Sequence, residues 1–230
     1  MTDVTNARDA VLDVARRLAA ADRDGDGPPT GSDDWSLDRR SLTFLACLVQ
    51  RLQPCAVLEF GSGASTVVLA TAMAALPVPA QSVAIESDPQ HHARTTCLLE
   101  ADGLEESVRL VPAHIVARRR RGRYVPIYEV DRQWDQGGDD VLRPGWADLI
   151  LVDGPPLPLG GREGALYQAL EAARTGAVIV LDDSRRDSER ELLGRLMSQF
   201  GGSVEAMNLL GFDKGLAVVI VTAPIEPEAR

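Results

Sequence analysis

The stretch Val57-Leu-Glu-Phe-Gly-Ser-Gly-Ala-Ser-Thr-Val-Val-Leu-Ala70 joins two apolar runs through a glycine turn. The first run, Ala56–Phe60, is interrupted only by Glu59, which is typical of a central strand in a parallel sheet covered on both faces. Gly61 and Gly63 lack Cβ atoms, so the backbone can turn sharply and a ligand can lie against it. The free N–H groups at the start of the following helix favour a carboxylate or a phosphate. The stretch therefore predicts a ligand-binding turn between a strand and a helix.

Composition favours one α/β domain. The chain has 230 residues, of which 45% are hydrophobic, which is enough for one substantial core but short for two. We expect an N-terminal helix and polar linker over residues 1–34, the main domain over 35–223 and a tail over 224–230. The formal net charge of −10 would repel nucleic acid and anionic membranes from most of the surface, which argues against both as partners.

Two features bear on the compartment. No apolar run approaches the roughly 20 residues needed to span a bilayer, and the acidic N-terminus lacks the pattern of a signal peptide. The three cysteines, Cys47, Cys55 and Cys97, are odd in number and have no metal-ligand spacing, so we expect reduced residues buried in the core. Together these features predict a cytoplasmic protein.

The N-terminal segment predicts an amphipathic helix. Apolar residues recur at spacings of three and four from Val4 to Leu18, which gives one apolar face that must be covered. We expect this face to pack on its own domain, and the alternative is a homodimer contact. The segment 22–34 is rich in Gly, Pro and Asp and predicts a polar linker before a second helix over Ser41–Leu52.

The rest of the chain alternates strands and helices, as in a doubly wound, mostly parallel sheet. The short turn between the last two strands makes that pair antiparallel. Seven strands are expected, over Ala56–Phe60, Ser82–Glu86, Val108–Val111, Asp148–Asp153, Ala177–Leu181, Val204–Leu210 and Leu216–Thr222.

Two residues at strand ends indicate a nucleoside. Glu86 ends the strand that follows the glycine turn, and in a doubly wound sheet a carboxylate there can accept hydrogen bonds from both ribose hydroxyls. His114 follows the third strand, where it could line the nucleoside pocket or be an ordinary loop histidine.

The stretch between the third and fourth strands is basic and then aromatic. We interpret Arg118–Arg121 and Arg123 as a solvated face rather than a nucleic-acid site, given the acidic chain. Tyr124–Tyr128 alternates like a strand or an ordered loop, and Trp134 follows it. These aromatic residues predict either a substrate wall or ordinary packing of the loop.

Three aspartates end two further strands. Asp153 ends the fourth strand, and Asp182 and Asp183 follow the fifth. Because ligands bind at the carboxyl edge of an open parallel sheet, we expect the three carboxylates to converge there and to need a cation between them. Mg²⁺ suits such a set because it binds a few carboxylates and keeps positions for water or substrate oxygens. The alternative is that these acids cap nearby helices, since Asp182 or Asp183 could cap the helix beginning near Ser188.

The order of these motifs resembles the class I S-adenosylmethionine-dependent methyltransferases over roughly Trp35–Ala223. The resemblance rests on Glu59-Phe-Gly-Ser-Gly63, Glu86, Asp153 and the final antiparallel pair. It implies that the methyl donor, S-adenosyl-L-methionine, contacts a set of nine positions. These are Glu59, Gly61, Ser62, Gly63, Ser65, Glu86, Ser87, His114 and Asp153.

The three aspartates further resemble the cation-dependent O-methyltransferases, whose metal ligands occupy the same strand ends. The resemblance implies Mg²⁺ at Asp153, Asp182 and Asp183, which would orient an acceptor hydroxyl and lower its pKa. Catechol-type members carry a lysine shortly after the first metal ligand, but Pro155 and Pro156 fill that region here. The catalytic base is therefore unassigned, with Asp153 and Arg162 as candidate catalytic residues. The expected acceptor is a small hydroxylated metabolite.

Two other functions share part of the pattern. An NAD(P)-dependent oxidoreductase has the same strand, turn and acid, but the turn lacks the third glycine of G-x-G-x-x-G. A non-catalytic nucleoside-binding domain on the same fold would have no reason to keep three aspartates at ligand-facing strand ends.

Overall fold

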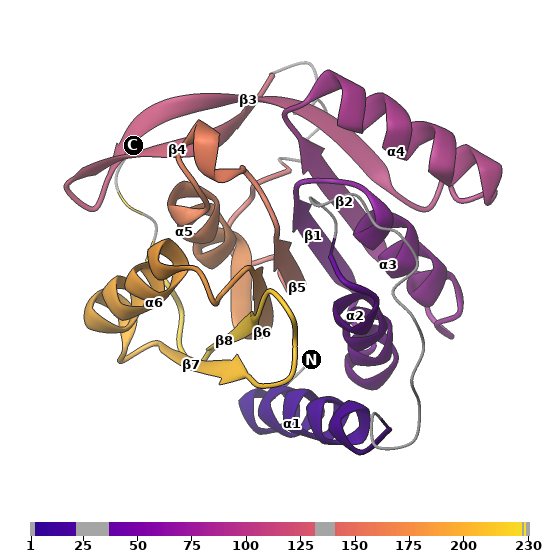
Figure 1. Ribbon diagram of the computed structural model, residues 1–230, viewed down its shortest axis with the longest axis horizontal. Helices are drawn as coiled ribbons and strands as arrows, with labels where there is room; N and C mark the ends of the chain where they lie inside the picture. Colours follow the sequence, from indigo (N-terminus) through magenta and orange to yellow (C-terminus); the bar gives the residue numbers. More distant parts are fainter. Residues whose placement is uncertain (1–2, 22–36, 132–140, 227, 229–230) are drawn as a thin grey trace.

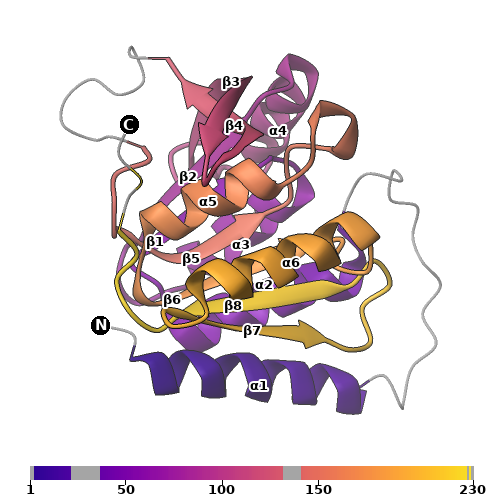
Figure 2. The ribbon, with the colours of Figure 1, turned by 90° about the vertical axis from the view of Figure 1, so that its left-hand side faces the viewer.

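A computed structural model describes residues 3–21, 37–131, 141–226 and 228. One eight-stranded sheet forms the centre, with the strand order β4-β3-β2-β1-β5-β6-β8-β7. Helices α1 to α4 cover one face and helices α5 and α6 the other (Figures 1 and 2). The predicted linker over residues 22–34 and Trp134 lie outside the described residues.

The element bounds follow the predicted alternation closely. The helices are α1 Val4–Ala21, α2 Arg39–Leu52, α3 Ala64–Ala74, α4 Pro89–Ala101, α5 Glu163–Ala172 and α6 Asp187–Phe200, with a short 3-10 helix η2 at Leu157–Leu159. The strands are β1 Ala56–Phe60, β2 Gln81–Glu86, β3 Arg109–Arg120, β4 Arg123–Val130, β5 Ala147–Val152, β6 Ala173–Asp182, β7 Val204–Leu209 and β8 Leu216–Val221.

The pairing directions confirm the doubly wound, mostly parallel α/β sheet. Strand β1 lies between β2 and β5 and is parallel to both, and β5 and β6 are also parallel. The last two strands pair antiparallel with each other, and β8 pairs antiparallel with β6. The carboxyl ends of β1, β2, β5 and β6 therefore meet at one edge of the sheet, where ligands bind in this architecture.

The sheet has eight strands rather than the seven expected. Strand β3 continues far beyond the predicted Val111 and folds back as β4 through Arg121 and Gly122. Both turn residues have positive φ, 48° and 81°, as a two-residue type I′ hairpin turn requires. The arginine run concealed the hairpin from sequence reasoning because charges on a solvated strand look like a charged loop.

The arginines of this hairpin are largely paired within the chain. Arg118 pairs with Glu129 across the hairpin, while Arg120 lies 3.7 Å from Glu171 and Arg123 lies 3.5 Å from Glu163, both on α5. These contacts pair three of the positive charges of the run with carboxylates of the same chain.

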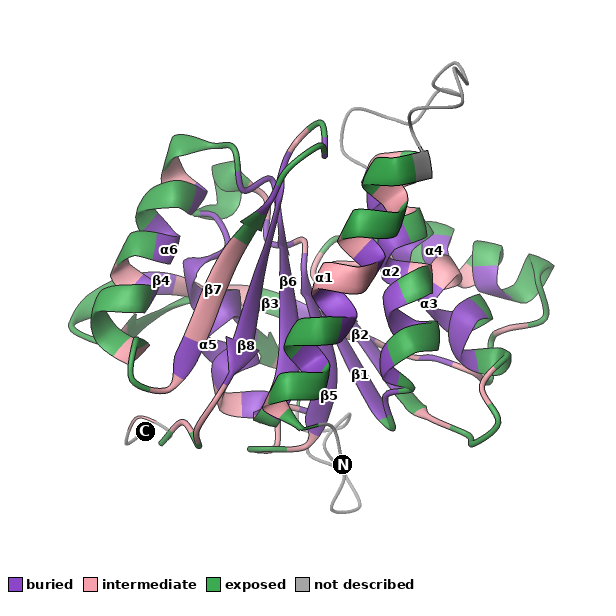
Figure 3. Ribbon diagram, turned by 90° about the horizontal axis from the view of Figure 1, so that it is seen from below, coloured by how far each residue is buried: buried purple, intermediate pink, exposed green. Residues whose placement is uncertain are grey.

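Helix α1 packs on its own domain, as expected. Its apolar residues Ala7, Ala10, Val11 and Val14 are buried against α2, β6 and β8. Figure 3 shows α1 lying over the strands, with buried and exposed positions alternating along the helix. Among the described residues, no helix is both long and apolar enough to cross a bilayer.

The prediction that the cysteines are buried is wrong. All three are free, but Cys47, Cys55 and Cys97 are exposed. Cys47 and Cys97 lie on the outer sides of α2 and α4, whose buried residues, such as Leu48 and Leu99, turn toward the core. An apolar neighbour in sequence does not bury a helical residue, because consecutive side chains point about 100° apart.

We predict that Gly164→Ala destabilises the fold by about 2 kcal/mol or more. A Cβ at Gly164, in the first turn of α5, would lie 1.7 Å from the carbonyl oxygen of Pro126 in β4, so the helix could no longer pack on the hairpin. The matched control is Gly194→Ala in α6, where a Cβ would meet no described atom within 4 Å. This control should stabilise the protein by about 0.5–1 kcal/mol. Equal unfolding midpoints in urea for both variants would contradict the prediction.

Candidate functional site

The glycine turn between β1 and α3 borders open space. Gly61 has a φ of 98°, and a Cβ there would lie 3.5 Å from the backbone nitrogen of Gly154, so this side of the turn packs against the end of β5. At Gly63 a Cβ would meet no described atom within 4 Å. The turn thus has one packed side and one side on which a ligand can lie against the backbone.

Glu59 holds this turn from beneath. Its side chain is 2% exposed, and its two carboxylate oxygens accept hydrogen bonds from the hydroxyls of Ser65 and Thr66 in the first turn of α3. The Thr66 hydroxyl in turn accepts a 3.0 Å hydrogen bond from the backbone N–H of Gly63. Burial raises the pKa of Glu59 to about 7, against the two hydroxyl hydrogen bonds that lower it. The sequence analysis did not identify this hydrogen-bond relay from Gly63 through Thr66 to Glu59.

Glu86 ties the end of β2 to the same turn. Its Oε1 accepts from the backbone N–H groups of Ser87 and Asp88, at 2.7 and 2.8 Å. Its Oε2 accepts from the Ser62 hydroxyl at 3.0 Å. The structure therefore brings Ser62, Glu86 and Ser87 together beside the glycines, as the sequence predicts for a nucleoside site.

His114 is the outlying member of the predicted set. It lies on β3, two residues beyond the position paired with Glu86, in the part of the strand that pairs with β4. Its side chain is 72% exposed, and its Nε2 is 3.9 Å from a carboxylate oxygen of Asp131. It is an exposed strand residue rather than a loop histidine.

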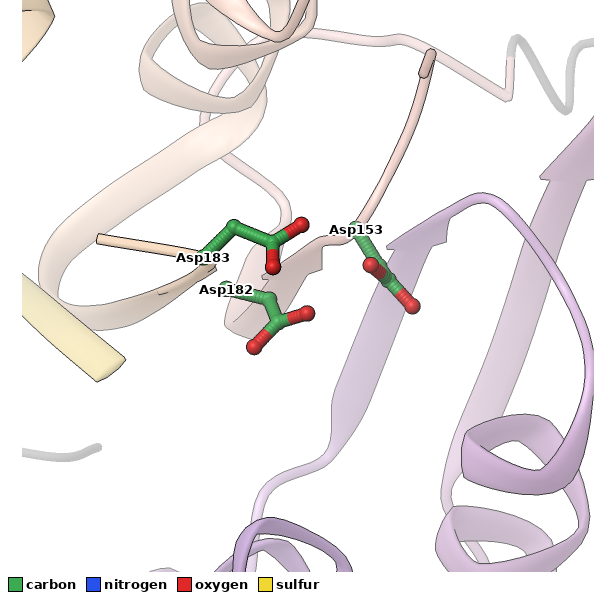
Figure 4. Close-up of side chains that lie close together, drawn as sticks. All are labelled: Asp153, Asp182 and Asp183. Carbon is green, nitrogen blue, oxygen red and sulfur yellow. The ribbon is translucent and has the colours of Figure 1, made fainter. Parts of the chain in front are cut away.

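The three predicted aspartates converge, as expected. Each offers a carboxylate oxygen, and the three oxygens lie within 4.8 Å of one another (Figure 4). Asp153 follows β5, whereas Asp182 ends β6 and Asp183 follows it with a φ of 60°, an uncommon conformation for a residue with a side chain. Backbone strain of this kind persists where the surrounding contacts over-determine it.

A guanidinium lies among these carboxylates. Arg162, the residue before α5, is 5% exposed and bonds Asp153 through both the carbonyl oxygen at 2.7 Å and Oδ1 at 2.8 Å. It also lies 2.6 Å from Asp183 and 3.8 Å from Asp182, and a fourth carboxylate, Glu189 of α6, is 3.6 Å away. Arg162 is therefore central to the acid cluster that we define as Asp153, Asp182, Asp183 and Glu189.

The carboxylates of the acid cluster stabilise the charged form of Arg162. Burial raises the pKa of Asp153 well above its usual value, while Arg162 opposes the shift, and burial with the adjacent Asp183 carboxylate raises the pKa of Asp182. Burial acts to lower the pKa of Arg162, but the three aspartates raise it above its usual value, so the guanidinium stays charged. The more exposed Arg186 adds a second positive charge, 2.7 Å from Asp183.

Tyr128 is a site residue whose place the sequence left open. It comes from β4, its ring packs 5.5 Å from Phe60, and its hydroxyl is hydrogen-bonded by Ser87. A Cβ on Gly154 would lie 2.1 Å from this hydroxyl, so Tyr128 occupies the space that the glycine leaves. Gln168 of α5 fixes the strand by hydrogen bonds of 2.8 Å to both the N–H and the carbonyl of Tyr128.

The other aromatic residues of the predicted substrate wall do not share this position. Tyr124 is 79% exposed near the hairpin turn, and Trp134 lies outside the described residues. Tyr128 alone of the three lies between the glycine turn with Glu86 and the acid cluster.

Comparisons with known proteins place the fold. No protein-family model matches the chain, and no curated protein matches it significantly. Solved structures do match. The Bacillus cereus O-methyltransferase in complex with S-adenosylhomocysteine superposes with a TM-score of 0.58 and 18% identity, covering 93% of this chain and 90% of that one.

Two more solved structures agree with this result. The O-methyltransferase TomG from Streptomyces achromogenes, in complex with S-adenosylmethionine, has a TM-score of 0.57 at 20% identity and covers 93% of this chain and 90% of its own. A methyltransferase from Geobacter sulfurreducens has a TM-score of 0.60 at 14% identity, with 93% and 89% covered. At these identities the likeness establishes the Rossmann-like methyltransferase fold of the chain.

We predict that Glu59→Gln makes stability less dependent on pH. The pKa of Glu59 is raised from 4.5 to about 7, so the folded state holds its proton more tightly than the unfolded state does. Its stabilising contribution is complete below pH 4.5 and is lost as the pH rises through 7. The amide keeps partners in the two hydroxyls, which can also accept. The stability of the variant relative to wild type should therefore rise by about 3 kcal/mol between pH 4.5 and 8.

The measurement is urea unfolding of both proteins across that pH range. Parallel stability curves for wild type and variant would show that Glu59 is not the titrating group.

Proposed function

We propose that this protein, whose fold is that of the S-adenosylmethionine-dependent O-methyltransferases, transfers a methyl group from S-adenosylmethionine to a hydroxyl of a small molecule. One observation carries the proposal. The glycine turn with Glu86 and the acid cluster with Arg162 lie at the same edge of the sheet, and the Tyr128 hydroxyl lies between them. A donor and an acceptor could therefore meet there. A cytoplasmic location, and a homodimer contact through α1, stay predictions.

We call the glycine turn over Gly61–Gly63, together with Glu59 and Glu86, the donor half of the site. Its residues suit each part of S-adenosylmethionine. The N–H groups at the start of α3 favour its carboxylate, and the open side of Gly63 lets it lie close to the backbone. Glu86 would accept hydrogen bonds from the ribose hydroxyls, with Ser62 and Ser87 beside it. Glu59 lies beneath the turn, where it holds the hydroxyls of Ser65 and Thr66, so we assign it the positioning of the turn and a long-range attraction for the donor's ammonium.

The acid cluster would prepare the acceptor. When bound, the donor supplies a methyl group made electrophilic by its sulfonium. Asp153 is the most exposed of the three aspartates, and its Cβ lies 3.8 Å from the position that a Cβ on Gly61 would take, so it faces the donor half. We assign Asp153 as the general base that accepts the acceptor's hydroxyl proton as the oxygen bonds to the methyl carbon and the carbon–sulfur bond breaks. Arg162 holds this carboxylate in position.

The predicted Mg²⁺ ion would compete with the Arg162 guanidinium for the three aspartates. The donor set is all oxygen, which is what Mg²⁺ prefers. Two of the three carboxylates already accept short hydrogen bonds from Arg162, which also lies 3.8 Å from the third. These residues therefore do not fit a metal ion while Arg162 keeps its place, and no step of the proposed reaction uses one.

We predict that the protein binds S-adenosylhomocysteine and does not bind NAD. Glu86→Gln should weaken this binding about 10- to 100-fold, which is about 1.4–2.7 kcal/mol, because an amide cannot accept from both ribose hydroxyls. Isothermal calorimetry measures both ligands. Glu191→Gln, the same change on the exposed side of α6, should leave the affinity unchanged. Tight NAD binding without a response to S-adenosylhomocysteine would favour an oxidoreductase instead.

We predict that Asp153→Asn lowers kcat by about 100-fold or more while S-adenosylhomocysteine affinity stays within about threefold of wild type. The amide keeps the shape of the side chain but cannot take the proton. A panel of hydroxylated compounds, screened for uptake of labelled methyl, first identifies an acceptor. Asp187→Asn, on the exposed first turn of α6, is the control and should retain full activity. Unchanged kcat in Asp153→Asn would remove Asp153 as the base.

A further inference from the structure

The acid cluster already contains a cation with contacts to every carboxylate that a metal ion would need. One terminal nitrogen of Arg162 bonds Asp153 twice and is 3.8 Å from Asp182, and the other lies 2.6 Å from Asp183 and 3.6 Å from Glu189. A Mg²⁺ ion requires oxygens at about 2.1 Å in near-octahedral order. It would have to draw on lone pairs that the guanidinium uses and would share a poorly solvated space with its positive charge.

Arg162 cannot easily move aside. Its backbone carbonyl accepts the first hydrogen bond of α5, from the N–H of Leu166 at 2.9 Å, so the residue is fixed at the start of a helix that is buried nearly throughout. Its side chain is 95% enclosed, and leaving would separate one buried positive charge from four carboxylates. Removing one partner from such a buried group is strongly destabilising.

The one N–H group of Arg162 without an acceptor also favours an oxygen atom beside it rather than a cation. Its Nε is buried and has no hydrogen-bond partner among the described residues. An N–H donor can be satisfied by an oxygen of water or of an acceptor molecule, whereas it repels a metal ion.

We infer that the Arg162 guanidinium is the permanent counter-ion of the acid cluster and that the cluster takes up no divalent metal ion. The inference concerns metal binding and stands apart from catalysis. Only its consequence, methyl transfer in the presence of a chelator, rests on the proposed function.

The test is a titration of the full-length protein with Mg²⁺ and Mn²⁺, by calorimetry and by the electron paramagnetic resonance of free Mn²⁺. Wild type should bind neither ion tighter than about 1 mM. Arg162→Met keeps the length of the side chain but removes its charge, so the carboxylates left without their counter-ion should bind Mn²⁺ at least tenfold more tightly than wild type. Arg186→Met is the matched control, since it removes the more exposed arginine beside Asp183 and leaves Arg162 in place. It should gain no metal affinity.

Wild-type binding of either ion in the micromolar range, lost in Asp182→Asn, would overturn the inference. A folded Arg162→Met protein without a gain in affinity would overturn the role of the guanidinium. If that variant does not fold, the wild-type titration decides alone. A parallel titration with S-adenosylhomocysteine separates the two proposals, because nucleoside binding together with metal binding refutes only this inference, and absent nucleoside binding refutes only the function.

Discussion

The acid cluster forms the acceptor half of the site, and it depends on ion pairs with the buried guanidinium of Arg162. Its partners come from the ends of β5 and β6 and from α6, and Arg162 itself begins α5. Four elements that are separate in sequence are thereby tied at one point of the sheet edge. Carboxylates at this density would repel one another without a cation, so the positions of both strand ends depend on this one side chain.

Such a cluster is a costly way to hold a fold. Buried ion pairs gain little over well-packed apolar groups, because desolvation offsets most of the Coulomb attraction. Removing one partner is nevertheless expensive, so the cluster is rigid once formed. The raised pKa of Asp153 reflects this incomplete compensation, since burial outweighs the help that Arg162 gives to its ionised form.

The donor half is held together differently, because the buried carboxylate of Glu59 supports the glycine turn. Glu59 holds Ser65 and Thr66, and Thr66 holds Gly63, so the glycines keep one conformation without side chains of their own. Tyr128 then links the two halves through Ser87 on one side and Gly154 on the other. The hairpin that supplies Tyr128 is fixed by Gln168, so the extra strand β4 serves the site as well as the sheet.

The sequence alone determined the α/β class, the acidic residues that end the parallel strands, and the convergence of Asp153, Asp182 and Asp183. These follow from local patterns, because apolar runs, glycine turns and strand ends are written in consecutive residues. It did not determine the hairpin β3–β4, the exposure of the cysteines, the place of Tyr128 or the contacts of Arg162. Each of these depends on which residues distant in the chain meet, as when Pro126 packs on Gly164 or Arg162 reaches Glu189. Only the tertiary structure shows that an arginine lies among the three aspartates. The reason is that the counter-ion of a carboxylate is set by which groups lie near it in space, whatever their separation in sequence.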